Sequence, residues 1–137
     1  MRVERSFLAI SVFIWAGYGV YCLSLPASLS LWHGVAAVEA HGSSELRAMY
    51  GGLQLAVGVL ALQGLLLPKW RATALNAIAW FSAGLGLGRV LGMMLEGHWP
   101  GIAIGLSVFE WSNALISALL LKSLLDRDEL SEQKRNG

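Results

Sequence analysis

The sequence predicts an all-α protein, an integral membrane four-helix bundle with both termini in the cytoplasm. Three observations support this fold class. The chain of 137 residues is 55% hydrophobic and only 14% charged, and its mean hydropathy of +0.57 is too high for a soluble domain of this size. Four apolar segments are each long enough to cross a bilayer. Basic residues cluster in the segments on one side of the predicted spans, which indicates the orientation of the protein in the membrane.

The first predicted span covers residues 7–25, which contain no charged side chain and suffice to cross a hydrocarbon core of roughly 30 Å. Pro26 ends this span, because proline lacks an N–H and clashes with a continuing helix. A cleaved signal peptide is the alternative interpretation. It is weaker because the apolar run exceeds the ~7–15 residues of a signal-peptide core.

Residues 28–44 form an outer connector of mixed composition. Leu31, Val35 and Val38 would share one face of a helix. The connector is therefore predicted to hold one short amphipathic helix at the membrane surface.

The remaining predicted spans cover residues 47–67, 74–95 and 102–125. Pro68 closes the second span, and a tight turn over residues 96–101 separates the third from the fourth. The charged segment 126–137 is predicted to be a frayed cytoplasmic tail. Residues 1–137 together are predicted to form a single membrane domain.

The basic residues set the predicted orientation, because cytoplasmic loops carry an excess of lysine and arginine. Eight of the ten lie at the amino end, in the second turn or near the carboxyl end: Arg2, Arg5, Lys69, Arg71, Lys122, Arg127, Lys134 and Arg135. Four spans place these three segments on the same side. Both termini are therefore predicted to be cytoplasmic, and the expected location is the bacterial inner membrane.

Small residues are predicted to bring the helices together, because lipid provides no hydrophobic drive for helix association. Gly84, Gly88 and Gly92 recur at every fourth position of the third span, and the second span contains Gly51 and Gly52. We predict that these five glycines mediate helix packing. The stretch GLGLGR is not a phosphate-binding loop, since it lies within a helix.

Polar residues are predicted to gather in the outer half of the bundle. Arg89 and Glu110 lie at nearly the same depth, roughly 10 and 13 Å below the outer surface. A lone charge there costs on the order of 2.5–3.5 kcal/mol. We therefore predict an ion pair between them. The polar residues expected around it are Arg47, Tyr50, Gln54 and Asn113.

Two interpretations of this cluster remain open. It either fixes helix packing alone or forms a ligand-binding pocket open to the outer face. In the second case Arg47, Tyr50 and Arg89 would hold an anionic or carbonyl-bearing head, and apolar walls would hold its tail. A metal site among the outer histidines and glutamates is a weaker interpretation, because no ligand spacing fixes a geometry.

The composition argues against several other functions. The basic residues follow topology, so nucleic acid is not an expected partner. The single cysteine, Cys22, allows neither an internal disulfide nor a multi-cysteine metal site. No nucleophile-elbow motif is present. We therefore expect no metal or cofactor, and an enzymatic role is less favoured than a binding role.

Three motifs resemble a family of small bacterial membrane proteins known only as a domain of unknown function. They are ELRAMYGG at residues 45–52, GRVLG at 88–92 and FEW at 109–111. The resemblance covers residues 5–125. It implies a set of characteristic family residues: Arg47, Tyr50, Gly51, Gly52, Arg89, Gly92 and Glu110.

A weaker similarity in size and four-helix layout extends to the DoxX and DoxD group, some of which are associated with quinone-linked sulfur oxidation. This chain shows no redox centre, so that activity is not carried over. The function predicted here is binding of a small molecule or lipid, or service as an accessory membrane subunit. The expected partners are the lipid bilayer, an apolar or anionic small molecule, and a second membrane protein or a second copy of the chain.

Two alternatives remain open. The first is a proton-coupled small transporter that acts as a dimer, with Glu110 exchanging a proton and substrate. The second is a partner subunit of a quinone-linked oxidoreductase.

Overall fold

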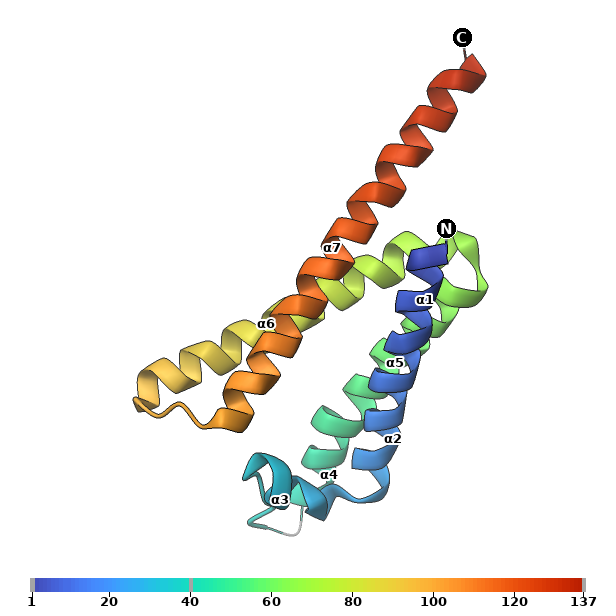
Figure 1. Cartoon of the computed structure of the whole chain (residues 1–137). Coiled ribbons are helices and arrows are strands. Elements are labelled where there is room, and N and C mark those ends of the chain that lie inside the picture. Colours follow the sequence, from blue (N-terminus) through green and yellow to red (C-terminus); the bar gives the residue numbers. More distant parts are fainter. Residues whose placement is uncertain (1, 40, 137) are drawn as a thin grey trace. The chain divides into compact units, whose positions relative to one another are not determined.

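The computed structural model describes residues 2–39 and 41–136, and within these ranges the chain is almost wholly helical, with no β-strand. Four helices are long and apolar enough to cross a membrane (Figure 1). The all-α class and the presence of four such helices are thereby confirmed. The chain divides into two compact units, Met1–Arg71 and Ala72–Gly137.

The first long helix runs over Arg2–Ser24. It consists of α1 (Arg2–Ser11), a π-helical segment η1 (Val12–Ala16) and α2 (Gly17–Ser24). The helix ends at Leu25, whose φ of −129° and ψ of 59° lie outside the helical region. The residue before a proline is pushed away from helical geometry, so Pro26 determines this end.

The connector contains a 3₁₀ turn, η2 (Pro26–Ser28), and one short helix, α3 (Leu29–His33). Gly34 ends α3 with a left-handed backbone, φ 67°, which glycine adopts without the penalty of a Cβ atom. The N–H groups of Gly34 and Val35 both donate to the carbonyl of Leu29, which satisfies an otherwise unpaired helix-end carbonyl.

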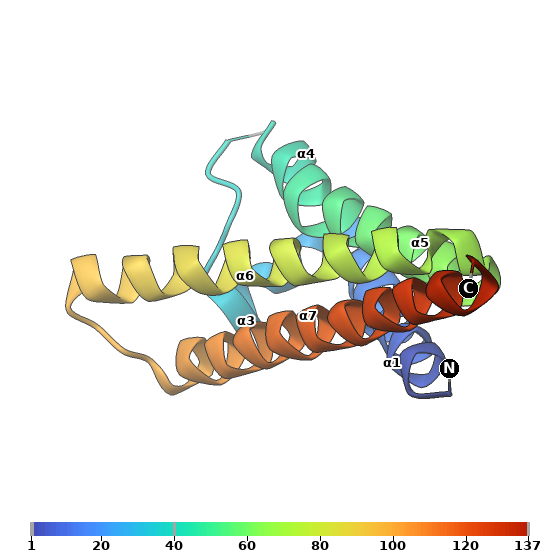
Figure 2. The same ribbon diagram turned by 90° about the horizontal axis from the view of Figure 1, so that it is seen from above.

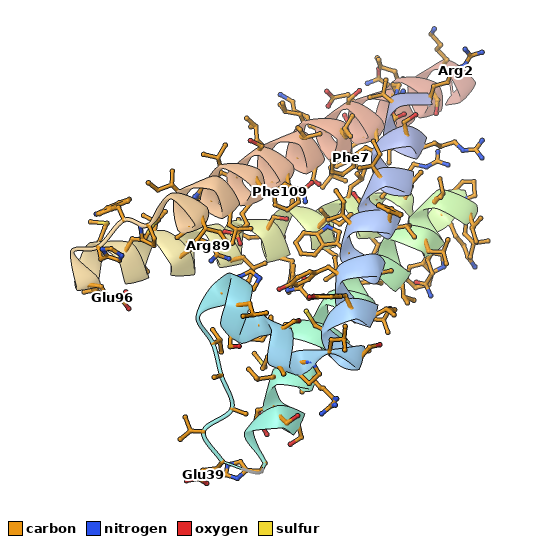
Figure 3. All side chains as sticks on the ribbon, turned by 60° about the horizontal axis from the view of Figure 1, so that its bottom comes forward. Arg2, Phe7, Glu39, Arg89, Glu96 and Phe109 are labelled. Carbon is orange, nitrogen blue, oxygen red and sulfur yellow. The ribbon has the colours of Figure 1, made fainter. Side chains whose placement is uncertain are left out.

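The predicted apolar face of Leu31, Val35 and Val38 was wrong. The helix stops at Gly34, so Val35 and Val38 do not follow Leu31 at helical spacing. Leu29 is the buried residue of α3, whereas Leu31 and Val38 are exposed. Figure 3 shows Glu39 in the loop that follows α3.

The second long helix runs over Gly42–Leu66 and begins several residues before the predicted span. It consists of α4 (Gly42–Leu46), a second π-helical segment η3 (Arg47–Gly52) and α5 (Leu53–Leu66). Within the first unit, η1 contacts α5 and η3 contacts α2. Each π segment thus lies against the other long helix.

Glycines bring the two long helices of the first unit into backbone contact. A Cβ atom on Gly19 would lie 2.6 Å from the backbone nitrogen of Leu55, and one on Gly58 would lie 2.5 Å from that of Ala16. A Cβ on Gly51 would lie 2.6 Å from Cγ of Leu23. Larger residues would not fit at these positions, as expected where membrane helices approach through small residues.

The second unit is an antiparallel helical hairpin. After the 3₁₀ turn η4 (Pro68–Trp70), α6 extends over Arg71–Glu96 and α7 over Gly101–Asn136. Gly97, with φ 62°, begins the turn between them. The two helices cross in the view of Figure 1, and Figure 2 shows them running side by side in opposite directions.

The prediction of a frayed tail after residue 125 was wrong, because α7 continues to Asn136. No glycine or proline occurs between Gly105 and Gly137, and most of the charged residues in this stretch are good helix formers. The side chain of Arg127 also donates to the carbonyl of Ser123, one turn earlier, at 3.0 Å.

Within the described residues of the second unit, the predicted glycine row of α6 does not lie at a close contact. A Cβ atom on Gly84, Gly88 or Gly92 would meet no atom within 4 Å, and one on Gly52 would meet only the Arg47 carbonyl of its own helix, at 3.8 Å. The close contact in α6 falls at Gly86. The packing role predicted for Gly84, Gly88 and Gly92 therefore stays a prediction.

Candidate functional site

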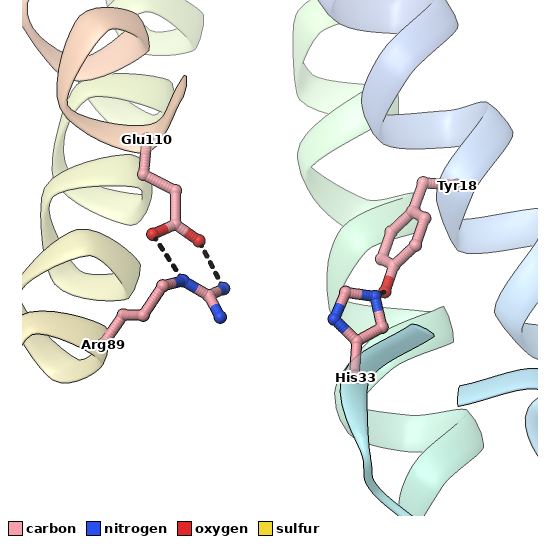
Figure 4. Close-up of polar contacts among 4 residues, drawn as sticks. All are labelled: Tyr18, His33, Arg89 and Glu110. Carbon is pink, nitrogen blue, oxygen red and sulfur yellow. Dashed lines mark hydrogen bonds and ion pairs between the residues drawn. The ribbon is translucent and has the colours of Figure 1, made fainter. Parts of the chain in front are cut away.

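Arg89 of α6 and Glu110 of α7 form a two-pronged ion pair. Nε of Arg89 donates to Oε2 of Glu110 at 3.0 Å, and Nη2 donates to Oε1 at 2.7 Å (Figure 4). The Glu110 side chain is 4% exposed and that of Arg89 is 28% exposed. Parallel N–H···O bonds of this kind fix geometry as well as adding energy, so the pair holds the two helices of the hairpin in register.

Buried polar residues extend from this pair along both helices. Ser107, Asn113 and Ser117 lie with Glu110 on one stripe of α7, and Ser82 lies on α6; all are buried. Among the described residues, the hydroxyl oxygens of Ser82, Ser107 and Ser117 have no hydrogen-bond partner. The second unit therefore contains buried hydroxyl groups in addition to the ion pair.

Trp111 packs across Gly86, a contact that sequence reasoning missed. A Cβ atom on Gly86 would lie 2.9 Å from Nε1 of Trp111. Gly86 lies outside the four-residue repeat formed by Gly84, Gly88 and Gly92. Its partner, Trp111, comes from α7 and not from α6. The signal that could have found it is the similar distance of Gly86 and Trp111 from the turn, close to the Arg89–Glu110 pair.

Arg47 connects the ends of the two long helices in the first unit. Its Nε donates to the carbonyl of Leu23 at 3.0 Å, and its Nη1 donates to the hydroxyl of Ser43 at 2.6 Å. The Leu23 carbonyl belongs to the last turn of α2, where backbone acceptors lack partners within the helix. Arg47 therefore has a structural role within the first unit.

Tyr50 belongs to an aromatic cluster with His33 and Tyr18. The Tyr18 hydroxyl and Nε2 of His33 share a hydrogen bond of 2.9 Å, with the donor set by the histidine tautomer (Figure 4). The rings of His33 and Tyr50 are 6.3 Å apart and tilted by 33°, and those of Tyr18 and His33 are 6.0 Å apart and edge-on. The connector thus places His33 between the two long helices of its unit.

A pocket of about 380 Å³ adjoins this cluster. Its lining is mostly apolar and comes from the first long helix and the connector: Tyr18, Tyr21, Ser28, Leu29 and His33. Cys22, Leu29 and Leu46 form a buried core, against which Tyr18 and Tyr50 pack. The pocket therefore borders a buried apolar core through Leu29, and the Tyr18–His33 pair forms its polar wall.

The predicted site residues divide between the two units. Arg47, Tyr50 and Gln54 lie in the first unit, whereas Arg89, Glu110 and Asn113 lie in the second. The structure brings Arg89 and Glu110 together. Gln54 is buried, and its Oε1 has no partner among the described residues. A single site made from both halves stays a prediction.

The sequence did not point to the Tyr18–His33 pair, because their pairing depends on where α3 ends. Gly34 stops α3 directly after His33. The His-Gly pair was the available signal. Among the described residues, no three histidine, cysteine or acidic side chains lie close enough together to hold a metal. His41 lies 3.4 Å from Glu39 on the surface.

Four apolar helices of this length, two of them joined by an ion pair between Arg89 and Glu110, are those of a small multi-pass membrane protein. The chain belongs to the family described as a domain of unknown function, DUF4345, whose model matches residues 3–121. All the candidate site residues lie inside that match. No curated protein and no solved structure matches the chain.

Proposed function

We propose that the protein binds a small amphipathic molecule in the pocket of its first unit. The ligand class is an apolar ring or chain that carries a carbonyl or hydroxyl oxygen. The observation that carries this proposal is the hydrogen-bonded Tyr18–His33 pair on the wall of an otherwise apolar pocket. Pockets that bind small molecules are mostly apolar, with a few polar groups that set orientation.

The dimensions and chemistry of the pocket support this ligand class. Its volume of about 380 Å³ falls in the usual range of about 300–1,000 Å³ for ligand pockets. Tyrosine and histidine side chains each donate and accept hydrogen bonds, which suits a neutral oxygen better than a fixed charge. Arg47 is engaged by Leu23 and Ser43, so an anionic head is the less supported choice.

The π-helical segments give a second line of support. Tyr50 lies within η3, and η1 ends shortly before Tyr18. Short π segments inside α-helices occur often at functional sites, because the wider turn displaces side chains from their regular positions. Here they flank the aromatic cluster on both long helices.

Two other functions receive less support. A proton-coupled transporter would have to release Glu110 in each cycle, yet both carboxylate oxygens are bonded to Arg89. A partner subunit of a quinone-linked oxidoreductase is compatible with the pocket, since a quinone is an apolar ring with carbonyl oxygens, but the chain shows no redox centre. The Arg89–Glu110 pair then stabilises the fold and takes no part in binding.

The experiment that tests this function compares two serine variants. Ser28 lines the pocket, whereas Ser30 is an exposed residue outside its lining. Both hydroxyls donate to a backbone carbonyl three residues earlier, Ser28 to Leu25 and Ser30 to Ala27. Ser28→Phe should fill the pocket, and Ser30→Phe should leave it open.

Native mass spectrometry of protein purified in mild detergent provides the readout. The parent and Ser30→Phe should retain a co-purified apolar molecule that Ser28→Phe has lost, and Tyr18→Phe should retain less of it. Equal retention in all four proteins, or no bound small molecule in the parent, would contradict the proposal. Helical circular dichroism controls for folding.

The proposed orientation places both termini in the cytoplasm and the pocket toward the opposite side. It rests on the basic residues at both ends and at Lys69 and Arg71. Reporter enzymes fused after Gly97 and after Gly137 should report opposite sides of the membrane. The same side for both fusions would refute this topology and leave the pocket itself unaffected.

A further inference from the structure

The second unit contains a groove between α6 and α7 that is separate from the Tyr18–His33 pocket. Its volume is about 520 Å³, and its floor consists of small side chains, Ala79 and Ala83 of α6 and Ala114 and Ala118 of α7. Trp80 borders it and is 73% exposed. The two helices diverge beyond their crossing (Figure 1), and the alanines leave the space between them unfilled.

Three charged residues line the end of this groove nearest the carboxyl terminus. Lys122, Asp126 and Glu129 recur at helical spacing on one face of α7, as positions four and seven residues apart do. Within the described part of the chain, none of the three takes part in a hydrogen bond or an ion pair. The charges are therefore available to a ligand.

The order of these groups matches the order of groups in one class of lipid. Toward the carboxyl-terminal end of α7, the groove presents an apolar floor, then a cation at Lys122, then carboxylates at Asp126 and Glu129. A phospholipid with a primary amine presents acyl chains, then a phosphate, then an ammonium group. Lys122 would contact the phosphate, and the carboxylates would accept hydrogen bonds from the ammonium group.

We propose that the α6/α7 groove binds an amine-bearing zwitterionic phospholipid of the phosphatidylethanolamine type. An acyl chain lies along the four alanines and beside the exposed ring of Trp80. Phosphatidylglycerol offers the same phosphate but no cation for Asp126 and Glu129. Phosphatidylcholine has a cation whose nitrogen cannot donate a hydrogen bond.

The test measures lipid preference directly. Protein is exchanged into detergent containing equal amounts of phosphatidylethanolamine and phosphatidylglycerol with identical acyl chains, and bound lipid is counted by native mass spectrometry. The parent should retain phosphatidylethanolamine over phosphatidylglycerol by about fivefold or more, the factor expected for one charge near the headgroup layer. Equal retention by the parent would overturn the proposal.

Matched variants separate the charges from the apolar floor. The double variant Asp126→Asn, Glu129→Gln should lose the preference for phosphatidylethanolamine. Asp128 lies on the same helix outside the groove lining, so Asp128→Asn should keep that preference. Ala118→Phe should lower retention of both lipids, and Leu119→Phe, on an exposed neighbouring position, should not. Unchanged preference in the double variant, or unchanged retention in Ala118→Phe, would refute the assignment.

Discussion

Glu110→Gln is expected to lower the free energy of unfolding by about 3–5 kcal/mol, the usual cost of removing one partner from a buried ion pair. The substitution preserves the size of the side chain but removes its charge. Arg89 then keeps its guanidinium charge among apolar helices without a carboxylate to neutralise it. The loss arises from this stranded charge more than from the missing hydrogen bonds.

A double-mutant cycle separates these contributions. Arg89→Gln and Glu110→Gln should each lower the free energy of unfolding. The double variant should lose less than the sum of these two losses, because it has no stranded charge. Unfolding is followed by circular dichroism as sodium dodecyl sulfate replaces a mild detergent. Asp128→Asn, which removes an exposed carboxylate on the same helix outside the groove lining, serves as the control. Strictly additive losses would argue against coupling between Arg89 and Glu110.

Gly19→Ala is expected to destabilise the first unit by about 1–3 kcal/mol, the range for overpacking a tight contact. The added Cβ would lie 2.6 Å from the Leu55 nitrogen and 2.9 Å from the Gly51 carbonyl oxygen. Both neighbours are backbone atoms, so the long helices must move apart to admit a methyl group.

Gly17→Ala is the matched control in the same helix, because a Cβ there meets no atom within 4 Å. This variant should be as stable as the parent or gain up to about 1 kcal/mol, since alanine favours a helix more than glycine does. The same detergent unfolding assay compares the two. Equal stability of Gly17→Ala and Gly19→Ala would show that the first unit does not depend on this backbone approach.

The long helices could be predicted because their signal is local. The length of the charge-free run before Pro26 and of the apolar run before Pro68 indicates a membrane span. The proline after each run indicates where the helix ends. The connector was predicted less well. A single left-handed glycine, Gly34, decides where α3 ends, and apolar spacing around it does not reveal that stop.

The candidate site was predictable where depth alone determines the partner. Arg89 and Glu110 lie at similar distances from the turn that joins their helices, and antiparallel packing brings them together. The Tyr18–His33 contact depends instead on the path of the connector. Likewise, helical spacing cannot tell whether Gly86 or Gly88 faces a neighbour, because that depends on the rotation of one helix against another.

The length of α7 has a mechanical consequence. Its 36 residues span about 54 Å, against a hydrocarbon core of roughly 30 Å. The 11 residues of α7 that follow the predicted span 102–125 therefore extend the continuous helix by about 16 Å. A small tilt of α7 inside the bilayer produces a larger displacement at the carboxyl-terminal part of the helix, so a spectroscopic label near Leu130 would register movements of the hairpin that are too small to detect at the ion pair itself.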